Sequence, residues 1–255
     1  MPEIHPSAIV SERARLAEDV SVGPFSIIDA GVEIGPGSVI GAHAWITGSS
    51  KLGKNNTVGY GTIIGADPQD TSFEVETGSN VEIGDDNVIR EYVTIHRSAA
   101  EGASTSVGHS NFLMTGVHLA HDVQMGSHNV LANNVLVAGH VKMADHVFLG
   151  GGSAFHQFIH IGQYAIVQGN AVVSRDVPPY CMGHGRNELA GLNVIGLRRG
   201  GFTPEERADI KRAYQLLFRS GGNMAESLAE ADQSTWTDAA KQLLHCARHA
   251  SRKGM

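Results

Sequence analysis

An aliphatic residue returns every six positions along the first part of the chain, and this period constrains the fold more than any other feature. Starting at residue 4, the series is Ile4, Val10, Leu16, Val22, Ile28, Ile34, Ile40, Ile46, Leu52, Val58 and Ile64. It resumes at Ile83, Ile89 and Ile95 and, after Glu101 at the next step, continues from 107 to 173. A period of six fits neither an α-helix nor simple strand alternation, and it indicates stacked hexapeptide repeats.

Hexapeptide repeats of this kind predict a parallel β-helix. Each hexad supplies one short strand and a turn, and three hexads make an 18-residue coil of triangular section with the aliphatic residues inside. The 11 hexads before the interruption and the 15 after it give 26, or eight to nine coils. One coil cannot bury its own apolar face, so the stacking of neighbours explains why the series is long.

Two breaks in the period predict loops that leave the prism. Ile64 and Ile83 are 19 residues apart, one coil plus one residue, and the residues between them are mostly polar or turn-forming. A second loop is expected from about Ala99 to Ser106, where Glu101 replaces an inward aliphatic residue and small polar residues dominate.

The period ends at residues 176–180, where two prolines cannot donate to a strand ladder. Thr203, Pro204 and Glu206 then form the capping-box pattern of a helix start, and further helices are expected over 224–231 and 234–252. We therefore predict a β-helix over residues 1–180, a glycine-rich linker over 181–202 and a small α-helical domain over 203–255.

Composition excludes several classes of protein. A net charge of −7 and a pI near 6.0 argue against general nucleic-acid binding. No window holds 18 consecutive apolar residues and the N-terminus lacks a signal pattern, so we expect neither membrane insertion nor export. Two cysteines, Cys181 and Cys246, give no disulfide framework, and a cytoplasmic location is expected.

Fourteen histidines are many for this length, and some of them converge on the 18-residue coil. His121 falls beside Gly139 and Asp122 beside His140 in the adjacent coil, with His156 near the same column. Such a patch suits proton abstraction from a hydroxyl, with a histidine base, a carboxylate that orients it and a backbone N–H for the oxyanion. Adjacent strand residues point to opposite faces, so a contact between His121 and Asp122 requires a corner or another chain.

Other histidines have a structural interpretation. His128 and His146 are 18 residues apart and are expected to stack on each other. The pair His118 and His121 lies on different parts of the triangular section, and no third ligand has evident coil spacing. We therefore expect neither a metal site nor a cofactor.

Several segments together resemble the UDP-N-acetylglucosamine O-acyltransferase family, hexapeptide-repeat enzymes that begin lipid A synthesis. The segments are Ile95-His96-Arg97, His118-Leu119-Ala120-His121-Asp122, Leu131-Ala132-Asn133-Asn134, Ala138-Gly139-His140, His156-Gln157-Phe158, Asp176-Val177-Pro178-Pro179-Tyr180, Gly191-Leu192-Asn193 and Gly196-Leu197-Arg198-Arg199. The resemblance implies a left-handed β-helix and a homotrimer with active sites between prisms. It also implies transfer of a long, 3-hydroxylated acyl chain from acyl carrier protein to the 3-position of UDP-N-acetylglucosamine, without a covalent acyl-enzyme.

The resemblance also implies residue roles. His121 would deprotonate the sugar hydroxyl, Asp122 would orient His121 and the Gly139 N–H would stabilise the oxyanion. Residues 181–202 would contact the nucleotide, and Gly169 would stand at the position that measures acyl length. The implied substrate-binding residues are Gln69, Asp70, His96, Met114, His118, His140, His156, Gln157, Gly169, Asn193 and Arg199.

Three positions depart from the family pattern. Ser72 replaces a lysine of the first loop, Ile195 stands where some members have glutamate, and Gly200 replaces an arginine. Loss of donors near a diphosphate weakens binding or alters sugar choice. A UDP-diamino-sugar acceptor and a non-catalytic sugar-nucleotide-binding or scaffold paralogue therefore remain as alternatives.

Charge distribution supports a carrier-protein partner independently. Between Arg198 and Arg219 there are six basic residues and three acidic ones, on a chain whose net charge is −7. The basic residues are Arg198, Arg199, Arg207, Lys211, Arg212 and Arg219. Such a surface attracts acidic acyl carrier proteins, although an ordinary solvated helix face has the same composition.

Overall fold

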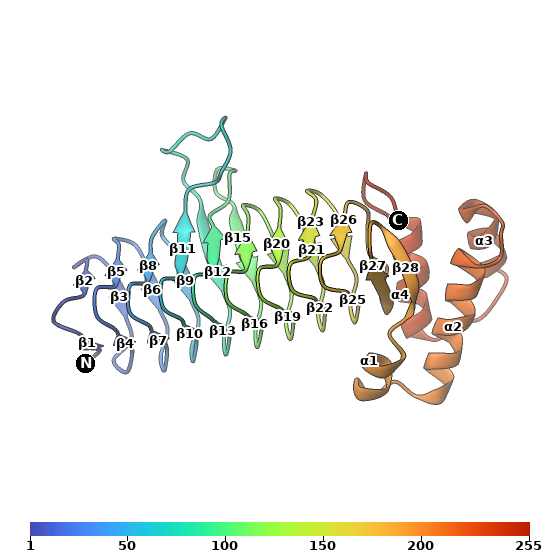
Figure 1. Ribbon diagram of the computed structural model, residues 1–255, viewed down its shortest axis with the longest axis horizontal. Helices are drawn as coiled ribbons and strands as arrows, with labels where there is room; N and C mark the ends of the chain where they lie inside the picture. Colours follow the sequence, from blue (N-terminus) through green and yellow to red (C-terminus); the bar gives the residue numbers. More distant parts are fainter.

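The computed structural model describes residues 1–255 and consists of a long parallel β-helix with helices at its C-terminal end (Figure 1). Each coil contributes short strands to three sheets, here called A, B and C, and strands three apart in sequence pair in parallel. In regular coils the pairing joins residues 18 apart, as in Ile28 with Ile46. The predicted class, a mainly β protein built as a left-handed β-helix with a small helical domain, is confirmed.

The three sheets run the length of the prism. Sheet A contains β1 (Glu3–Ile4), β4 (Ser21–Val22), β7 (Val39–Ile40), β10 (Thr57–Val58), β13 (Val88–Ile89), β16 (Phe112–Leu113), β19 (Val130–Leu131), β22 (Phe148–Leu149), β25 (Ile166–Val167), β27 (Cys181–His184) and β28 (Glu188–Leu192). Sheet B contains β2 (Ile9–Val10), β5 (Ile27–Ile28), β8 (Trp45–Ile46), β11 (Ile63–Ala66), β14 (Thr94–His96), β17 (His118–Leu119), β20 (Leu136–Val137), β23 (Ala154–Phe155) and β26 (Val172–Val173). Sheet C contains β3 (Arg15–Leu16), β6 (Glu33–Ile34), β9 (Lys51–Leu52), β12 (Asn80–Ile83), β15 (Ser104–Val107), β18 (Gln124–Met125), β21 (Lys142–Met143) and β24 (His160–Ile161).

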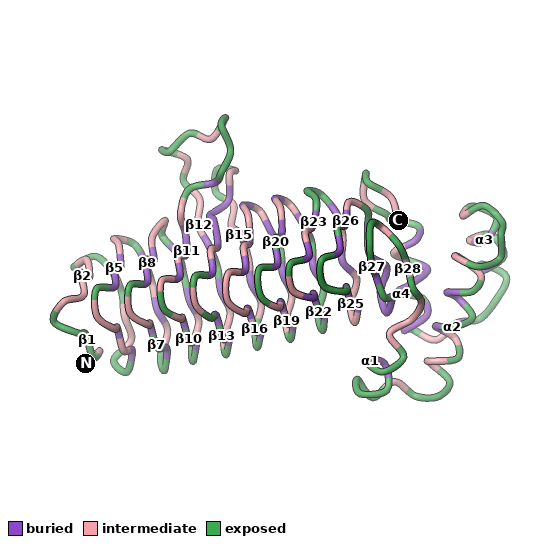
Figure 2. Tube along the Cα trace, viewed as in Figure 1, coloured by how far each residue is buried: buried purple, intermediate pink, exposed green.

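The predicted inward residues form the core. In most strands the first residue faces outward and the second is buried, as in β7 and β10. Together with apolar residues near the corners, they form one cluster of 37 buried side chains inside the prism (Figure 2). Ile4 alone starts the series exposed, because no earlier coil covers it. Each buried aliphatic side chain contributes roughly 1.5–3 kcal/mol, so the stacked rows hold the coils together.

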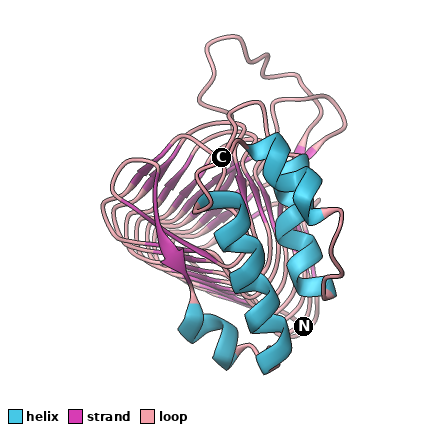
Figure 3. Ribbon diagram, turned by 90° about the vertical axis from the view of Figure 1, so that its right-hand side faces the viewer, coloured by secondary structure: helices cyan, strands magenta, loops and turns pink.

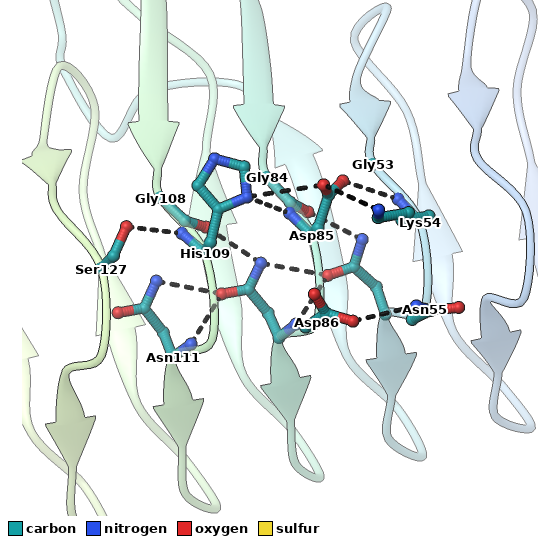
Figure 4. Close-up of polar contacts among 12 residues, drawn as sticks. Gly53, Lys54, Asn55, Gly84, Asp85, Asp86, Gly108, His109, Asn111 and Ser127 are labelled. Atoms are coloured by element: carbon teal, nitrogen blue, oxygen red, sulfur yellow. Dashed lines mark hydrogen bonds and ion pairs between the residues drawn. The ribbon is translucent and has the colours of Figure 1, made fainter.

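A row of buried asparagines links the coils at one corner (Figure 4). Asn56 Oδ1 accepts from the backbone N–H and the side-chain amide of Asn87, both at 3.0 Å. Asn87 Oδ1 accepts in the same way from Asn111 at 2.9 Å, and Asn111 Oδ1 accepts from Asn129 N at 2.8 Å. An unpaired buried amide would cost about 1–3 kcal/mol, so this row favours one register of the stacked coils.

The first predicted loop is present, but its length differs from the expectation. Leu52 pairs with Ile83, 31 residues on rather than 18, so this coil carries an insertion of 13 residues. The interruption is therefore one hexad plus a loop, and the interpretation as one coil plus one residue was wrong. The loop follows β11 and rises from the edge of the prism (Figure 1).

The second loop is shorter than expected at its C-terminal end. Ile83 pairs with Val107, 24 residues on, so this coil carries six extra residues, and β15 already begins at Ser104 rather than after Ser106. Glu101 lies in this loop and not at an inward position. Its carboxylate accepts a hydrogen bond of 2.7 Å from Gly78 N in the first loop, which ties the two loops together.

The C-terminal part covers one end of the prism (Figure 3). The segment expected to be a linker instead holds β27, the antiparallel β28 and helix α1 (Val194–Arg199). Helix α2 (Pro204–Phe218) begins with the predicted capping box, α3 (Met224–Ala231) has the predicted bounds, and α4 (Asp238–Arg248) is shorter than expected. No helix of the chain is both long and apolar enough to span a bilayer.

Candidate active site

His121 and Asp122 form a hydrogen-bonded pair at the corner between β17 and β18. Asp122 has φ of 60°, a left-handed conformation that asparagine, aspartate and histidine adopt more readily than other side chains. This turn brings adjacent side chains together, and His121 Nδ1 lies 2.8 Å from Asp122 Oδ2. The contact that we expected to require a corner or a second chain thus forms at a corner within one chain.

The Asp122 carboxylate is held in place by the second loop. Ser98 Oγ donates to Oδ1, and Ala99 N donates to Oδ2 at 3.2 Å. Burial raises the pKa of Asp122, but the hydrogen bonds from Ser98, His121 and Ala99 outweigh burial and keep that pKa below its ordinary value. Because a carboxylate only accepts, the proton of neutral His121 lies on Nδ1 and Nε2 keeps its lone pair.

Gly139 lies directly beside the His121 ring in the next coil. A Cβ at this position would stand 2.8 Å from both Cε1 and Nε2 of His121, so a side chain here would displace the ring. The Gly139 N–H donates no hydrogen bond within the chain although the residue is buried. Asn133 and Asp145 occupy the same position in their hexads as Gly139. Their N–H groups also lack partners, but these residues are exposed to water. A buried donor without a partner is thus available next to the imidazole.

A cavity of about 750 Å³ opens in front of this pair, along the outer face of sheet B. Of the predicted site residues it brings together Gln69, His118, His121, Gly139, His156 and Gln157. His140 contacts the site from its edge, with its ring 5.2 Å from that of His121 and its Nε2 3.7 Å from Asp122 Oδ2. The coil arithmetic therefore placed the central residues of the cavity correctly.

His118, which lines the cavity, forms a neutral pair with His96. Their rings meet edge to face at 5.0 Å, and His118 Nδ1 lies 2.7 Å from Thr94 Oγ1. Burial, with smaller contributions from His96 and His121, lowers the pKa of His118 to about 4. Burial also lowers the pKa of His96. Neither ring carries a charge near neutral pH, so both can offer polar contacts without repelling a protonated His121.

The first loop is fastened to the site by a buried arginine. Arg97 donates to Asp67 Oδ1 at 2.8 Å and to the carbonyl oxygens of Thr77 at 2.5 Å and Val75 at 2.8 Å. Its guanidinium also lies 4.8 Å from the centroid of the Phe73 ring. With a further bond of 3.2 Å to Ser79 Oγ, five contacts from one side chain hold the loop that carries Gln69 and Asp70 over the cavity.

Ser72, one of the departures from the family pattern, makes a local turn with Asp70. Its N–H and hydroxyl both donate to Asp70 Oδ1, at 2.9 and 2.7 Å. These bonds lower the pKa of Asp70, and the fields of His121 and His140 act in the same direction. Asp70 is thus kept ionised close to the corner of His121 and Asp122, and Ser72 fixes its orientation.

Besides Asp70, His96 and His140, which lie next to the cavity without lining it, four further predicted binding residues do not line it. Met114 follows β16 in sheet A, and the exposed Gly169 follows β25 in the same sheet. Asn193 caps helix α1 and donates to the Tyr164 carbonyl at 2.9 Å, so within this chain it has a structural role. Arg199 is exposed at the end of α1. Their predicted contacts with substrate stay predictions, and within one chain they lie apart from His121.

The structure bears on two expectations about the histidines, one concerning metal ligands and one concerning stacking. Potential ligand atoms of His121, Asp122 and His140 all lie within 4.8 Å of one another, a group that does not include His118. The predicted stack of His128 on His146 is present, with ring centroids 4.8 Å apart. The absence of a catalytic metal stays a prediction.

Several residues of the site were not predicted. Ser98 and Ala99 hold Asp122 from an inserted loop, where coil arithmetic gives no neighbours. Ser174 and Arg186 line the cavity from its C-terminal end. Arg186 lies in the segment expected to be a linker, so only the pairing of β27 with the prism reveals it.

The basic residues of the helical domain divide into two groups. Arg212 lies 4.0 Å over the Trp236 ring and 3.0 Å from Asp209, and it donates to the Thr235 carbonyl, so it stabilises the domain. A separate cavity of about 630 Å³ opens on the same domain. Its basic lining residues are Arg198, Arg207, Lys211 and Arg219. Lys211 and Arg198 have no partner within the chain and are the stronger candidates for a docking surface.

The prism and its polar corner define a hexapeptide-repeat transferase. Residues 13–48 match the family model for bacterial transferase hexapeptide repeats, and residues 176–255 match that for UDP-N-acetylglucosamine O-acyltransferase domain 2. An acyl-[acyl-carrier-protein]–UDP-N-acetylglucosamine O-acyltransferase of Herminiimonas arsenicoxydans is 41% identical over 95% of this chain and 94% of its own length. One of Thiobacillus denitrificans is 40% identical over 99% and 98%.

Solved structures agree with these sequence relatives. A UDP-N-acetylglucosamine acyltransferase from Bacteroides fragilis superposes with a TM-score of 0.93 at 38% identity, covering 98% of both chains. A second from Campylobacter jejuni gives 0.92 at 32% identity, covering 99% of this chain and 98% of its own. The chain belongs to the family of UDP-N-acetylglucosamine O-acyltransferases, and the prediction of an enzyme of this family is confirmed.

Proposed function

We propose that the protein transfers a long, 3-hydroxylated acyl chain from acyl carrier protein to the 3-hydroxyl of UDP-N-acetylglucosamine. The observation that carries this proposal is the arrangement of His121 between the Asp122 carboxylate and the free Gly139 N–H. The names of the relatives, which include both the carrier protein and the sugar nucleotide, support the substrate classes.

Each group at the corner has a chemical task in this reaction. His121 Nε2 takes the proton from the sugar hydroxyl as the oxygen attacks the thioester carbonyl. Asp122, held by Ser98 and Ala99, stabilises the imidazolium that forms. The negative charge that develops on the thioester oxygen is stabilised by the Gly139 N–H. When the carbon–sulfur bond breaks, the carrier's sulfur leaves and takes the proton from the His121 imidazolium. No covalent acyl-enzyme is formed.

The acceptor is proposed to bind below the first loop. Gln69 lines the cavity and the charge of His121 lowers the pKa of Asp70, so both can contact sugar hydroxyls near the base. Ser72 stands where the family has a lysine, and its two hydrogen bonds fix the orientation of the Asp70 carboxylate. A UDP-diamino-sugar stays the second candidate, since an ionised Asp70 also suits an amino group.

A homotrimer is proposed from the contrast between the outer faces. Outward residues on sheets A and B include exposed apolar side chains such as Val39, Trp45 and Phe148. The matching positions on sheet C carry alternating charges, Arg15, Glu33, Lys51 and Glu82. Packing of sheets A and B between copies would cover the apolar surface, and light scattering would then report three times the 27.0 kDa chain mass.

A substrate panel tests the proposed reaction. Purified protein is incubated with 3-hydroxyacyl and unsubstituted acyl carrier proteins of several lengths and with UDP-N-acetylglucosamine or a UDP-diamino-sugar, and products are identified by mass spectrometry. We expect O-acylated UDP-N-acetylglucosamine. A product formed only from the diamino-sugar would replace the acceptor, and no product with any pair would contradict the proposal.

A further inference from the structure

We propose that Ser98 is a positioning residue that links the first loop, which carries Gln69 and Asp70, to the base His121. The inference rests on the proposed reaction, because it concerns how that base is held and when it is correctly oriented. Three features of Ser98 support it: the bond that its hydroxyl makes, the contacts of its backbone and its burial away from the cavity.

The hydroxyl of Ser98 is the only group of the chain that bonds Asp122 Oδ1. The other carboxylate oxygen, Oδ2, is shared by His121 Nδ1 at 2.8 Å and Ala99 N at 3.2 Å. The backbone of Asp122 is fixed as well, because its N–H donates to Thr105 Oγ1 at 2.8 Å. Without the Ser98 hydroxyl, Oδ1 has no partner and the carboxylate is free to rotate toward another donor. The hydroxyl thus determines which oxygen faces the imidazole.

The orientation of this carboxylate decides where the proton of His121 lies. A carboxylate only accepts, so its bond holds the proton of the neutral ring on Nδ1 and leaves the lone pair of Nε2 free. When the carboxylate turns away, the proton is free to move to Nε2, and that nitrogen no longer has the lone pair that accepts the sugar proton. Ser98 therefore acts on the base through Asp122.

The backbone of Ser98 is held where the first loop ends. Ser79 is the last residue before β12, and its hydroxyl donates to the Ser98 carbonyl. Asn80 is the first residue of β12, and its carbonyl accepts from Ser98 N at 3.3 Å. The residue before Ser98 is Arg97, whose side chain fastens the same loop and bonds Ser79 Oγ at 3.2 Å. Two consecutive residues thus join the loop to the carboxylate of Asp122.

Ser98 is fully buried and does not line the cavity in front of His121. No other residue of the second loop lines it either. The second loop lies beside the first instead, and Gly102 N donates to the Gly78 carbonyl at 2.8 Å (Figure 1). Because Ser98 has no access to a substrate in the cavity, its effect on the reaction passes through Asp122.

This link makes the orientation of the base depend on the first loop. A sugar nucleotide that binds below the loop and contacts Gln69 restrains the loop, and Ser79 then restrains the backbone of Ser98. Ser98 in turn keeps Asp122 aimed at His121. Part of the binding energy of the sugar nucleotide is thereby used to orient the base for the attack.

Chemical labelling tests the link without relying on turnover. Diethyl pyrocarbonate modifies the free lone pair of a neutral imidazole, and peptide mass mapping of the full chain gives the rate at His121. Rates are compared on their high-pH plateau, where the ring is neutral in every variant. We expect Ser98→Ala to lower this rate about tenfold, the equivalent of one charged hydrogen bond, and Ser79→Ala to lower it less.

Ser26→Ala is the matched control. Ser26 is also fully buried, and its hydroxyl donates to the Gly41 carbonyl at 2.6 Å and accepts from Ala44 N at 3.3 Å. It lies in an early coil, so its replacement should cost as much stability as Ser98→Ala without changing the labelling of His121. An equal fall in labelling in both variants would show a general loss of structure and would overturn the proposal.

The double variant distinguishes a link from two independent effects. If the first loop acts on His121 through Ser98, Ser79→Ala has no further effect once the Ser98 hydroxyl is absent. Losses that multiply in the double variant, or an unchanged labelling rate in Ser98→Ala, overturn the proposal.

Steady-state kinetics connect the labelling to the reaction. Ser98→Ala should lower kcat about tenfold and leave the KM for UDP-N-acetylglucosamine unchanged, because Ser98 does not line the cavity. A raised KM with an unchanged kcat would make Ser98 part of substrate binding and would overturn the assignment. A wild type without turnover that still shows the expected labelling pattern would refute the proposed reaction alone.

Discussion

The coils at the N-terminal end and the coils around His121 share one core but differ at their corners. In the early coils the corner side chains stack on one another, as Phe25 does on His43 with ring centroids 5.1 Å apart. At the candidate catalytic corner His121 instead bonds to its neighbour Asp122, and two loops bring further polar groups to the same place. The inward residues determine the fold, so the corners and loops are free to vary and to carry chemistry.

The largest expected effect is a loss of turnover without a loss of stability when His121 is replaced. His121→Ala should lower kcat by about 10²- to 10⁴-fold, the usual contribution of a general base. The melting temperature should change little, because the ring contributes to no hydrophobic core. Activity with a saturating acyl donor and thermal unfolding are measured on the same samples.

The matched control is His128→Asn, which removes a stacked corner histidine and keeps a side chain suited to its φ of 61°. We expect its turnover to remain near that of wild type. Equal losses in both variants would mean that the two kinds of corner do not differ in function.

A substitution in the shared core should have the opposite result, a loss of stability without a loss of turnover. Ile46 is fully buried in an early coil, so Ile46→Ala should reduce the free energy of unfolding by about 2–5 kcal/mol through loss of burial and a residual cavity. The kcat of the folded fraction should not change, because the site lies several coils away. Urea unfolding measures the first quantity and active-site-normalised kinetics the second, and a large fall in kcat would show that the early coils support the site directly.

The sequence predicts the regular coils well and the inserted loops poorly. The hexad period located Ile28, Leu131 and their counterparts in the core, and the 18-residue step brought His121 next to Gly139. Inserted loops follow no period, so the bonds from Ser98 and Ala99 to Asp122 could not be predicted. The segment before Gly201 was predicted to be a linker because it lies outside the hexad series. Its strand β27 is recognised only from its pairing with β25 of the prism.

A smaller effect is expected where a loop meets the regular coils. Arg97→Lys keeps the charge but loses most of the five contacts that fasten the first loop, since an ammonium cannot reproduce the planar fork. The KM for the sugar nucleotide should rise about tenfold, the equivalent of one charged hydrogen bond, with kcat reduced less. Steady-state kinetics should show no such rise for Arg90→Lys, whose side chain pairs with Glu91 at the surface.

If Arg97→Lys lowers kcat and leaves this KM unchanged, the loop positions the catalytic groups rather than the substrate. Recovery of the wild-type rate at high sugar concentration is not sufficient evidence, so binding of the sugar nucleotide is also measured directly. A change in affinity that matches the change in KM would assign the effect to the loop.

The smallest expected effect is on the pH dependence of stability. It concerns His118, a partly buried histidine in β17. The pKa of His118 is about 4 in the folded protein and near 6.5 when the chain is unfolded. Between these values the unfolded chain binds more protons, so the contribution of His118 to stability is present above pH 6.5 and is lost as the pH falls toward 4. His118→Gln should therefore lose less stability than wild type between pH 6.5 and 4.5. Urea midpoints at several pH values measure the difference, and parallel curves for the two proteins would show that burial does not keep His118 neutral.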